Sequence, residues 1–399
     1  MSATGFATSL TQLDEFFAGV HAESREQLLA RERNTFDRLT SPFSDSIVLF
    51  GAGHLGKYVS KGLAQAGVRI RAFADNNPKL WRTEVNGLPV LKPEDAVQQY
   101  GSNSSFVVTI YHGSHARQQL RGMGCQAVAS FIPLCWKYGE IFVPESGLDY
   151  PHLIRDNEQS IRLCYSLFAD DASRTEFVEQ LRFRYWLDSE RVPSARLTKQ
   201  TYFLVPSRKD EVFADCGALD GDSIRAFIEH SGGHFDHVIG IEPDPDSNKL
   251  LSHYLANLPE PQRSQSTAFP YAVGNRNARV QFNVTSSAAS KMTTGGSAEV
   301  ECRKLDDVPW PKTPTYIKMD IEGAEPEALA GASQLLASHH PVLAVCVYHR
   351  SQHLWEIPSQ IRGISDGYDI FLRRYAEDCW ELVCYAVPRA RVQADGLLH

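Results

Sequence analysis

The chain has 399 residues, which is long for one domain of typical size and suggests two. Its hydrophobic content of 43% and charged content of 22% are ordinary for a globular protein with large buried cores. The net charge of −8 argues against a nucleic-acid partner, because domains that bind nucleic acids usually present a basic face.

The cysteines and the N-terminus predict a cytoplasmic protein. The eight cysteines are scattered and form no Cys-x-x-Cys pair, so we expect reduced core residues and neither disulfides nor a zinc site. The N-terminus lacks the basic start and apolar core of a signal peptide. No stretch approaches ~18 uninterrupted apolar residues, so no membrane span is expected. A homo-oligomer is compatible with the sequence, which gives no direct sign of quaternary state.

The first part of the chain predicts helices followed by an α/β domain. Apolar residues at helical spacing over 8–40 predict a pair of helices, and we assign 1–44 to them. Over 45–145, apolar strand-like runs alternate with helical segments, which predicts βαβ units and a parallel sheet. We interpret 45–145 as a Rossmann-like nucleotide-binding domain.

A glycine-rich loop follows the first predicted strand of that domain. In IVLFGAGHLGKYV, Gly51, Gly53 and Gly56 have the GxGxxG spacing of a phosphate-binding loop, and Asp75 ends the second strand, where a ribose partner belongs. The region resembles Rossmann-like domains of sugar-modifying enzymes in surface-polysaccharide pathways. It could bind NAD(P), a nucleotide sugar or nothing, since no convincing catalytic set for redox chemistry follows it.

The second part of the chain repeats the alternation. Residues 146–200 are charged, helical in period and poor in Gly and Pro, which predicts a helical connector. Over 201–392 strands and helices alternate again, interrupted by a β-rich insert with two arms around TTGG that predicts a hairpin. The fold class is therefore α/β, with two Rossmann-like doubly wound sheets.

The second domain has its own glycine loop, which differs from the first. In FADCGALDGDS, Asp215 precedes Gly217 and Gly221, and we expect Asp222 or Ser223 to cap the following helix. The wider loop suits a ligand without phosphates but with an amino-acid end, whose ammonium group Asp215 could hold. The glycines let the backbone approach a ligand closely.

The strand after this loop ends in another carboxylate. Glu242 lies at the position where a ribose diol is usually bound, and the alternative is that it only starts the turn that Pro243 continues. The third strand should end beside an adenine ring, with Ala272 and Val273 as contacts.

These motifs resemble S-adenosylmethionine binding in class I methyltransferases. IKMDIEGAEPEAL at 317–329 and VYHRSQHLWEIPSQI at 347–361 resemble the FkbM methyltransferase family specifically, and the likeness covers about 200–390. It implies a mostly parallel seven-stranded sheet and methyl transfer to a hydroxyl group, commonly on a sugar or polyketide-type acceptor. The cofactor contacts that it implies are Asp215, Gly217, Ala218, Gly221, Ser223, Glu242, Pro243, Ala272 and Val273.

Three residues near later strand ends are candidates for the chemistry. Asp320 ends the fourth strand and could orient or deprotonate the acceptor, and His349 ends the next strand as a candidate general base. Glu322 could share this role, whereas Glu325 is expected only to favour a helix start near Pro326. These carboxylates could alternatively hold Mg²⁺, which we do not favour.

Two details complete the expectations for the second domain and for the whole chain. If the strand that carries His349 continues regularly, Tyr348 points to the opposite face. Two other functions stay open: an NAD(P)-dependent sugar-modifying oxidoreductase that uses the first domain, and a non-catalytic nucleotide-sugar-binding protein.

Overall fold

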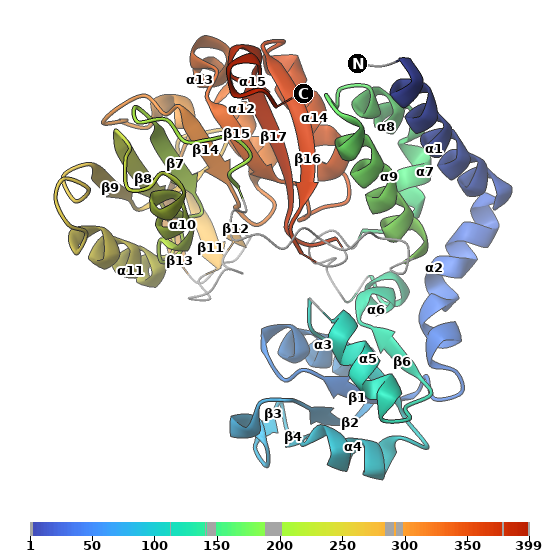
Figure 1. Ribbon diagram of the computed structural model, residues 1–399. Helices are drawn as coiled ribbons and strands as arrows, with labels where there is room; N and C mark the ends of the chain where they lie inside the picture. The colour runs from blue at the N-terminus through green and yellow to red at the C-terminus, as the bar shows by residue number, and fades with distance from the viewer. Residues whose placement is uncertain are drawn as a thin grey trace. The chain divides into compact units, whose positions relative to one another are not determined.

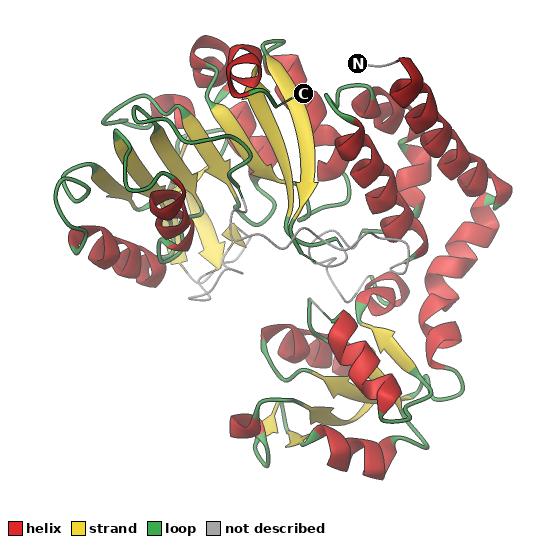
Figure 2. Cartoon of the chain, in the orientation of Figure 1, coloured by secondary structure: helices red, strands yellow, loops and turns green. Residues whose placement is uncertain are grey.

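The computed structural model describes residues 3–111, 113–139, 141, 149–187, 202–283, 291–292, 298–376 and 379–397. They divide into two compact units, each with its own sheet (Figures 1 and 2). The smaller unit is Phe17–Asp156 with Arg184–Ser189. The larger unit is Met1–Phe16, Asn157–Phe183 and Glu190–His399. The expected α/β class with two mostly parallel sheets is confirmed.

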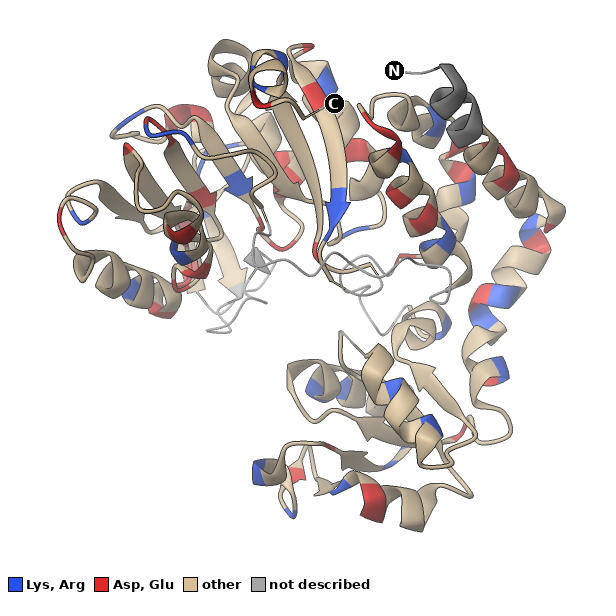
Figure 3. Cartoon of the chain, in the orientation of Figure 1, with Lys and Arg blue, Asp and Glu red and all other residues tan. Residues whose placement is uncertain are grey.

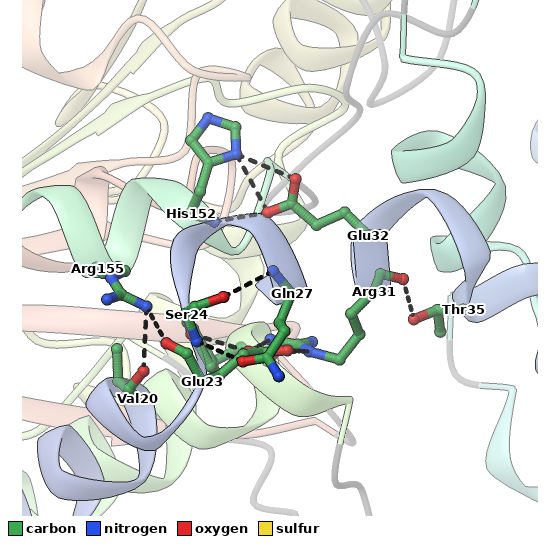
Figure 4. Close-up of polar contacts among 10 residues, drawn as sticks. Val20, Glu23, Ser24, Gln27, Arg31, Glu32, Thr35, His152 and Arg155 are labelled. Atoms are coloured by element: carbon green, nitrogen blue, oxygen red, sulfur yellow. Dashed lines mark hydrogen bonds and ion pairs between the residues drawn. The ribbon is translucent and has the colours of Figure 1, made fainter. Parts of the chain in front are cut away.

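The predicted pair of N-terminal helices is present as α1 (Ala3–Ala22) and α2 (Arg25–Thr40). Figure 4 shows the turn before α2, where Ser24 and Gln27 form a capping box: each side chain accepts a hydrogen bond from the other's backbone N–H, at 3.2 and 2.7 Å. Acidic and basic residues alternate along α2 (Figure 3). Glu32 of this helix is buried, and the backbone N–H of His152 replaces water as a hydrogen-bond donor to its carboxylate, at 2.7 Å.

The smaller unit contains a six-stranded sheet in the order β3-β4-β2-β1-β5-β6. All its strand pairs are parallel except β3 with β4. The central strands are buried because their side chains are continuously apolar, as is usual where helices cover both faces of a parallel sheet. The strands are β1 (Ser46–Phe50), β2 (Arg69–Ala74), β3 (Glu84–Val85), β4 (Leu88–Leu91), β5 (Ser105–Val108) and β6 (Val128–Ser130). The helices are α3 (His54–Gln65), η1 (Pro78–Leu80), α4 (Pro93–Tyr100), α5 (Ser114–Gly122) and α6 (Ile132–Lys137).

The expected helical connector contains three helices in the described residues: α7 (His152–Asp156), α8 (Glu158–Tyr165) and α9 (Asp171–Trp186). Within the connector, one division between the two units falls between α7 and α8, and α8 belongs to the larger unit. A second division falls inside α9, after Phe183. The end of the connector, 188–201, lies outside the described residues.

The larger unit contains the predicted seven-stranded sheet, and its strands follow the order β16-β17-β15-β14-β7-β8-β9. Only β17 runs antiparallel to its neighbours. The strands are β7 (Val212–Cys216), β8 (His237–Ile241), β9 (Ser266–Phe269), β14 (Tyr316–Met319), β15 (Val342–Cys346), β16 (Tyr368–Arg374) and β17 (Leu382–Pro388). The helices are α10 (Asp222–His230), α11 (Pro245–Ala256), η2 (Leu305–Asp307), α12 (Glu325–Ala330), α13 (Ser333–His339), α14 (His353–Ile364) and α15 (Arg389–Asp395).

The β-rich insert forms a small sheet in the order β10-β13-β11-β12. Its strands are β10 (Tyr271–Val273), β11 (Ala278–Asn283), β12 (Lys291–Met292) and β13 (Ala298–Arg303). The arms β11 and β13 pair antiparallel, as a hairpin requires, and the TTGG segment lies outside the described residues. The expected third strand of the large sheet is broken at Pro270, because proline has no N–H to donate, so that β9 and β10 enter different sheets.

Two further expectations concern the chain as a whole. All eight cysteines are buried and free of disulfides. Within the described residues, no helix combines the length and the apolar character that crossing a bilayer would require.

Candidate active site

A cavity of about 790 Å³ lies in the larger unit and is lined by residues that follow β7, β8 and β14. These strands are adjacent and parallel, so their carboxyl ends meet at one edge of the sheet, where α/β proteins usually bind ligands. The wall includes eight of the predicted site residues: Gly217, Ser223, Glu242, Pro243, Ala272, Val273, Asp320 and Glu322. Four other predicted site residues are not among the described residues that line the cavity: Asp215, Ala218, Gly221 and His349.

The glycine loop after β7 requires glycine for steric reasons. Gly217 has φ +80°, and a Cβ there would lie 2.0 Å from the backbone oxygen of Asp320. Gly221 also has a positive φ, +88°, and is the N-cap of α10. The expectation that Asp222 or Ser223 caps this helix is therefore wrong: the left-handed turn at Gly221 lets the helix begin one residue earlier.

Asp215 forms a buried ion pair that the sequence reasoning did not find. Its carboxylate is fully buried, 2.9 Å from Nζ of Lys318 on the neighbouring strand β14. Burial raises the pKa of Asp215 to about 6, and Lys318 opposes this shift. Lys318 also donates to the backbone oxygen of Gly217 at 2.9 Å and reaches the cavity wall. The side chain that faces the cavity here is thus a lysine, with Asp215 behind it.

Glu242 follows β8 and is held in one orientation by two backbone donors. One carboxylate oxygen accepts from the N–H of Leu219 and the other from the N–H of Asp244, both at 2.8 Å. Burial raises the pKa of Glu242 to about 7, although these donors and Lys318 act in the opposite direction. A carboxylate oxygen has two lone pairs, so each can still accept a ligand hydroxyl.

The small sheet supplies the apolar part of the wall. Ala272 and Val273 line the cavity as predicted, although they belong to β10 and not to the large sheet. Tyr271 and Phe282 line it too, and only the aromatic content of the insert could have suggested them.

Asp320 follows β14 and is surrounded by hydrogen-bond donors. Tyr202 donates to one carboxylate oxygen at 3.0 Å, and Tyr348 donates to the other at 3.3 Å. Nε2 of His349 also lies 3.3 Å from Asp320. The expectation that Tyr348 faces away from His349 is wrong, because β15 ends at Cys346 and the alternation of a strand does not continue beyond it.

His349 lies between carboxylates and is buried. Its Nδ1 is 2.9 Å from Glu325, and its Nε2 is 3.8 Å from Glu322. Burial disfavours the charged ring, but Glu325, Asp320 and Glu322 outweigh it and raise the pKa of His349 to about 10. A ring that already carries its proton accepts no other, which makes Asp320 the better candidate for the proton acceptor.

Glu325 does more than the sequence suggested. It is the first residue of α12, as expected, but its carboxylate is fully buried and accepts a hydrogen bond from the N–H of Ile321 at 2.9 Å. Burial opposes its ionisation, yet His349 lowers the pKa of Glu325 to about 2. The distance between 325 and 349 in the sequence explains why the pair was missed.

The glycine loop of the smaller unit has a similar construction. Gly51 has φ +110°, and a Cβ on Gly56 would lie 2.0 Å from the backbone oxygen of Gly51. Gly53 is the N-cap of α3 and has open space where a Cβ would lie. Asp75 accepts from the backbone N–H of Ala52 and of Asn77, both at 2.7 Å. A carboxylate after the second strand is thus anchored to the glycine loop in both units.

The seven-stranded order, the glycine loop after β7 and the carboxylate after β8 together define a class I methyltransferase fold. Comparison with family models is more specific: residues 215–375 match the methyltransferase FkbM domain. These residues therefore form a methyltransferase domain of the FkbM family, whose cofactor is S-adenosylmethionine.

A crystal structure of methyltransferase FkbM from Methylobacillus flagellatus KT has the same fold. Its TM-score is 0.74 at 24% sequence identity, and the match covers 95% of this chain and 100% of that chain.

The N-terminal region is similar to a different protein, the redox-sensing transcriptional repressor Rex of Bacteroides fragilis. The two are 32% identical over 111 residues, which is 26% of this chain and 50% of the relative. The chain thus spans half the length of that relative.

Proposed function

We propose that the protein transfers a methyl group from S-adenosylmethionine to a hydroxyl group of a small molecule. A sugar, a nucleotide sugar or glycan, or a polyketide-like compound would suit it, and the cytoplasm is the compartment that we propose. One observation carries the proposal: Glu242 and Asp320, from two different strands, face one cavity of about 790 Å³.

The residues around the cavity fit this cofactor. Glu242 has free lone pairs for the ribose hydroxyls, and the apolar side chains of Ala272, Val273 and Phe282 offer a surface for the adenine ring. Gly217 and its positive φ keep the loop free of a side chain that would fill the space. Asp215 would contribute through Lys318, which it holds at the wall.

For methyl transfer, the protein must align the acceptor hydroxyl with the methyl group and accept the proton of that hydroxyl. S-adenosylmethionine, when bound, supplies an activated methyl group whose bonding electron pair stays with the sulfur, which leaves as a neutral thioether. Asp320 would accept the proton of the acceptor hydroxyl, and Tyr202 and Tyr348 hold its carboxylate in position for that step.

The proposal is tested by separating binding from transfer. Isothermal titration should show binding of S-adenosylmethionine, and methyl-labelled cofactor should label a hydroxyl compound in a panel of nucleotide sugars, glycans and polyketide lactones. Asp320→Asn should still bind the cofactor but transfer about 10²–10⁴-fold more slowly. A protein that binds no S-adenosylmethionine, or an Asp320→Asn variant that transfers at the full rate, would refute the proposal.

A second ligand is favoured by the smaller unit. Asp75 and the loop at 51–56 repeat the anchoring seen at Glu242, and the match to Rex adds a redox-sensing protein as a relative. We propose that this loop binds a nucleotide, with NAD(H) and nucleotide sugars as the alternatives. The GxGxxG spacing suits a pyrophosphate at the start of α3.

A further inference from the structure

The group around His349 contains more negative charge than its two imidazoles can balance, even with His353 lying 3.5 Å from the other oxygen of Glu325. Three carboxylates converge on the ring: Asp320 at 3.3 Å, Glu322 at 3.8 Å and Glu325 at 2.9 Å. His349 and Glu325 are buried, so water cannot easily compensate for the imbalance.

The imidazole itself is not satisfied by hydrogen bonds. Although carboxylate oxygens lie within 2.9–3.8 Å, neither ring nitrogen of His349 makes a hydrogen bond of acceptable geometry within the described part of the chain. A buried polar atom without such a bond calls for another partner. A metal ion is one, since it displaces the proton of Nε2 into solvent and bonds to the nitrogen lone pair that this exposes.

The two ring nitrogens face different surroundings. Nδ1 faces Glu325, which is fully buried and is fixed by the N–H of Ile321. Nε2 faces Asp320 and Glu322, whose side chains are 21% and 25% exposed and line the cavity. In metal sites, a histidine ligand commonly has a carboxylate at one ring nitrogen while the other binds the metal.

We propose that Asp320, Glu322 and Nε2 of His349 bind one divalent transition-metal ion at the cavity wall, with Glu325 orienting the ring from behind. Two ligand atoms bonded to one ion at about 2.1 Å lie about 3.0–3.8 Å apart when their angle is about 90–130°. The separations of Nε2 from the carboxylate oxygens of Asp320 and Glu322, 3.3 and 3.8 Å, fall in this range. One imidazole and two carboxylates suit Mn²⁺, Fe²⁺ or Zn²⁺ better than Mg²⁺.

This inference rests on the proposed function, because the ion would serve the methyl acceptor. Asp320 and Glu322 belong to the same wall as Glu242, so an acceptor hydroxyl in the cavity can reach the ion. A metal-bound hydroxyl loses its proton at a lower pH than a free one. The substrate class is thus a hydroxyl compound with an oxygen free to coordinate.

The test measures Mn²⁺ binding by the full chain after treatment with EDTA. Free Mn²⁺, followed by its electron paramagnetic resonance signal, should show one bound ion per chain. Glu322→Gln and His349→Ala should each weaken binding at least tenfold, and Glu325→Gln about 10–100-fold, since it acts through the ring. His253→Ala is the matched control, because this histidine is exposed on α11, and its Mn²⁺ affinity should stay within twofold.

The variants guard against a trivial loss of folding. His349→Ala removes a buried ring and so disturbs the interior. Glu322 is partly exposed, and Glu322→Gln leaves the buried contact between His349 and Glu325 intact. The inference is refuted if the wild type binds no Mn²⁺ at millimolar concentration, or if Glu322→Gln binds it as tightly as the wild type. Titration of S-adenosylmethionine in the same EDTA-treated sample tests the proposed function separately.

Discussion

At the scale of single residues, Glu242 should control cofactor affinity. Its carboxylate is fixed by the N–H groups of Leu219 and Asp244 and faces the cavity. Glu242→Gln should weaken binding of S-adenosylmethionine about 10–100-fold, because hydrogen bonds to a charged acceptor are worth about 1.5–3 kcal/mol. Isothermal titration measures this, with Glu229→Gln on the exposed side of α10 as the control. Equal affinities of the two variants would contradict the role.

Because Glu242 titrates, the affinity for S-adenosylmethionine should depend on pH. Burial raises the pKa of Glu242 to about 7, with Asp244 acting in the same direction and Lys318 against it. The pKa of Glu242 is higher in the folded state than in the unfolded state, so its protonated form contributes to folding stability. This contribution is fully present below about pH 4.5 and is lost as the pH rises through about 7. Ribose hydroxyls favour the ionised form, so cofactor affinity should increase between pH 6 and 8. In Glu242→Gln this increase should be absent, and a steep increase in that variant would assign the titration elsewhere.

The pair of Asp215 and Lys318 should matter for stability. Lys318→Met leaves Asp215 as a buried charge without its partner, which should lower the free energy of unfolding by about 3–5 kcal/mol. Denaturant unfolding measures the loss. The double variant with Asp215→Asn should recover much of it. Lys249→Met removes an exposed ion pair with Asp246 and should cost less than about 1 kcal/mol.

At the scale of the elements, the loop after β7 depends on one glycine. Gly217→Ala places a Cβ 2.0 Å from the backbone oxygen of Asp320 in a conformation with φ +80°. The loop must move away from β14, so we expect a loss of several kcal/mol in unfolding free energy and loss of cofactor binding. Gly363→Ala in the exposed part of α14 is the control, with open space and a gain of up to about 1 kcal/mol. Similar stability of the two variants would show that the loop is not constrained.

The elements also show what the sequence can predict. The alternation of apolar strands and helices was sufficient for the seven-stranded sheet, because it is a local pattern repeated along the chain. The predicted ends of strands were less reliable. Because β15 ends at Cys346, Tyr348 does not follow the alternation of the strand and its hydroxyl donates to Asp320. The pairing of Asp215 with Lys318, and of His349 with Glu325, depends on neighbouring strands and helices that no local pattern specifies.

At the scale of the whole molecule, two carboxylates in two units have the same construction. Asp75 accepts from Ala52 and from Asn77, two residues after it, and Glu242 accepts from Leu219 and from Asp244, also two residues after it. Each follows the second strand of its sheet and is anchored to the loop after the first. A carboxylate held in the same way in both units favours a nucleoside ligand in each.

Two nucleoside sites in one chain can be separated by paired variants. Full-length protein should bind S-adenosylmethionine through Glu242, and a nucleotide through Asp75. Asp75→Asn should therefore weaken binding of NADH or of a UDP-sugar about 10–100-fold, because it removes a charged acceptor, while S-adenosylmethionine still binds with the wild-type stoichiometry. Glu242→Gln should give the reverse pattern. If neither NADH nor a UDP-sugar binds the wild type, the anchored Asp75 serves only the stability of its own loop, since its bonds to Ala52 and Asn77 already hold the first and second strands together at that edge.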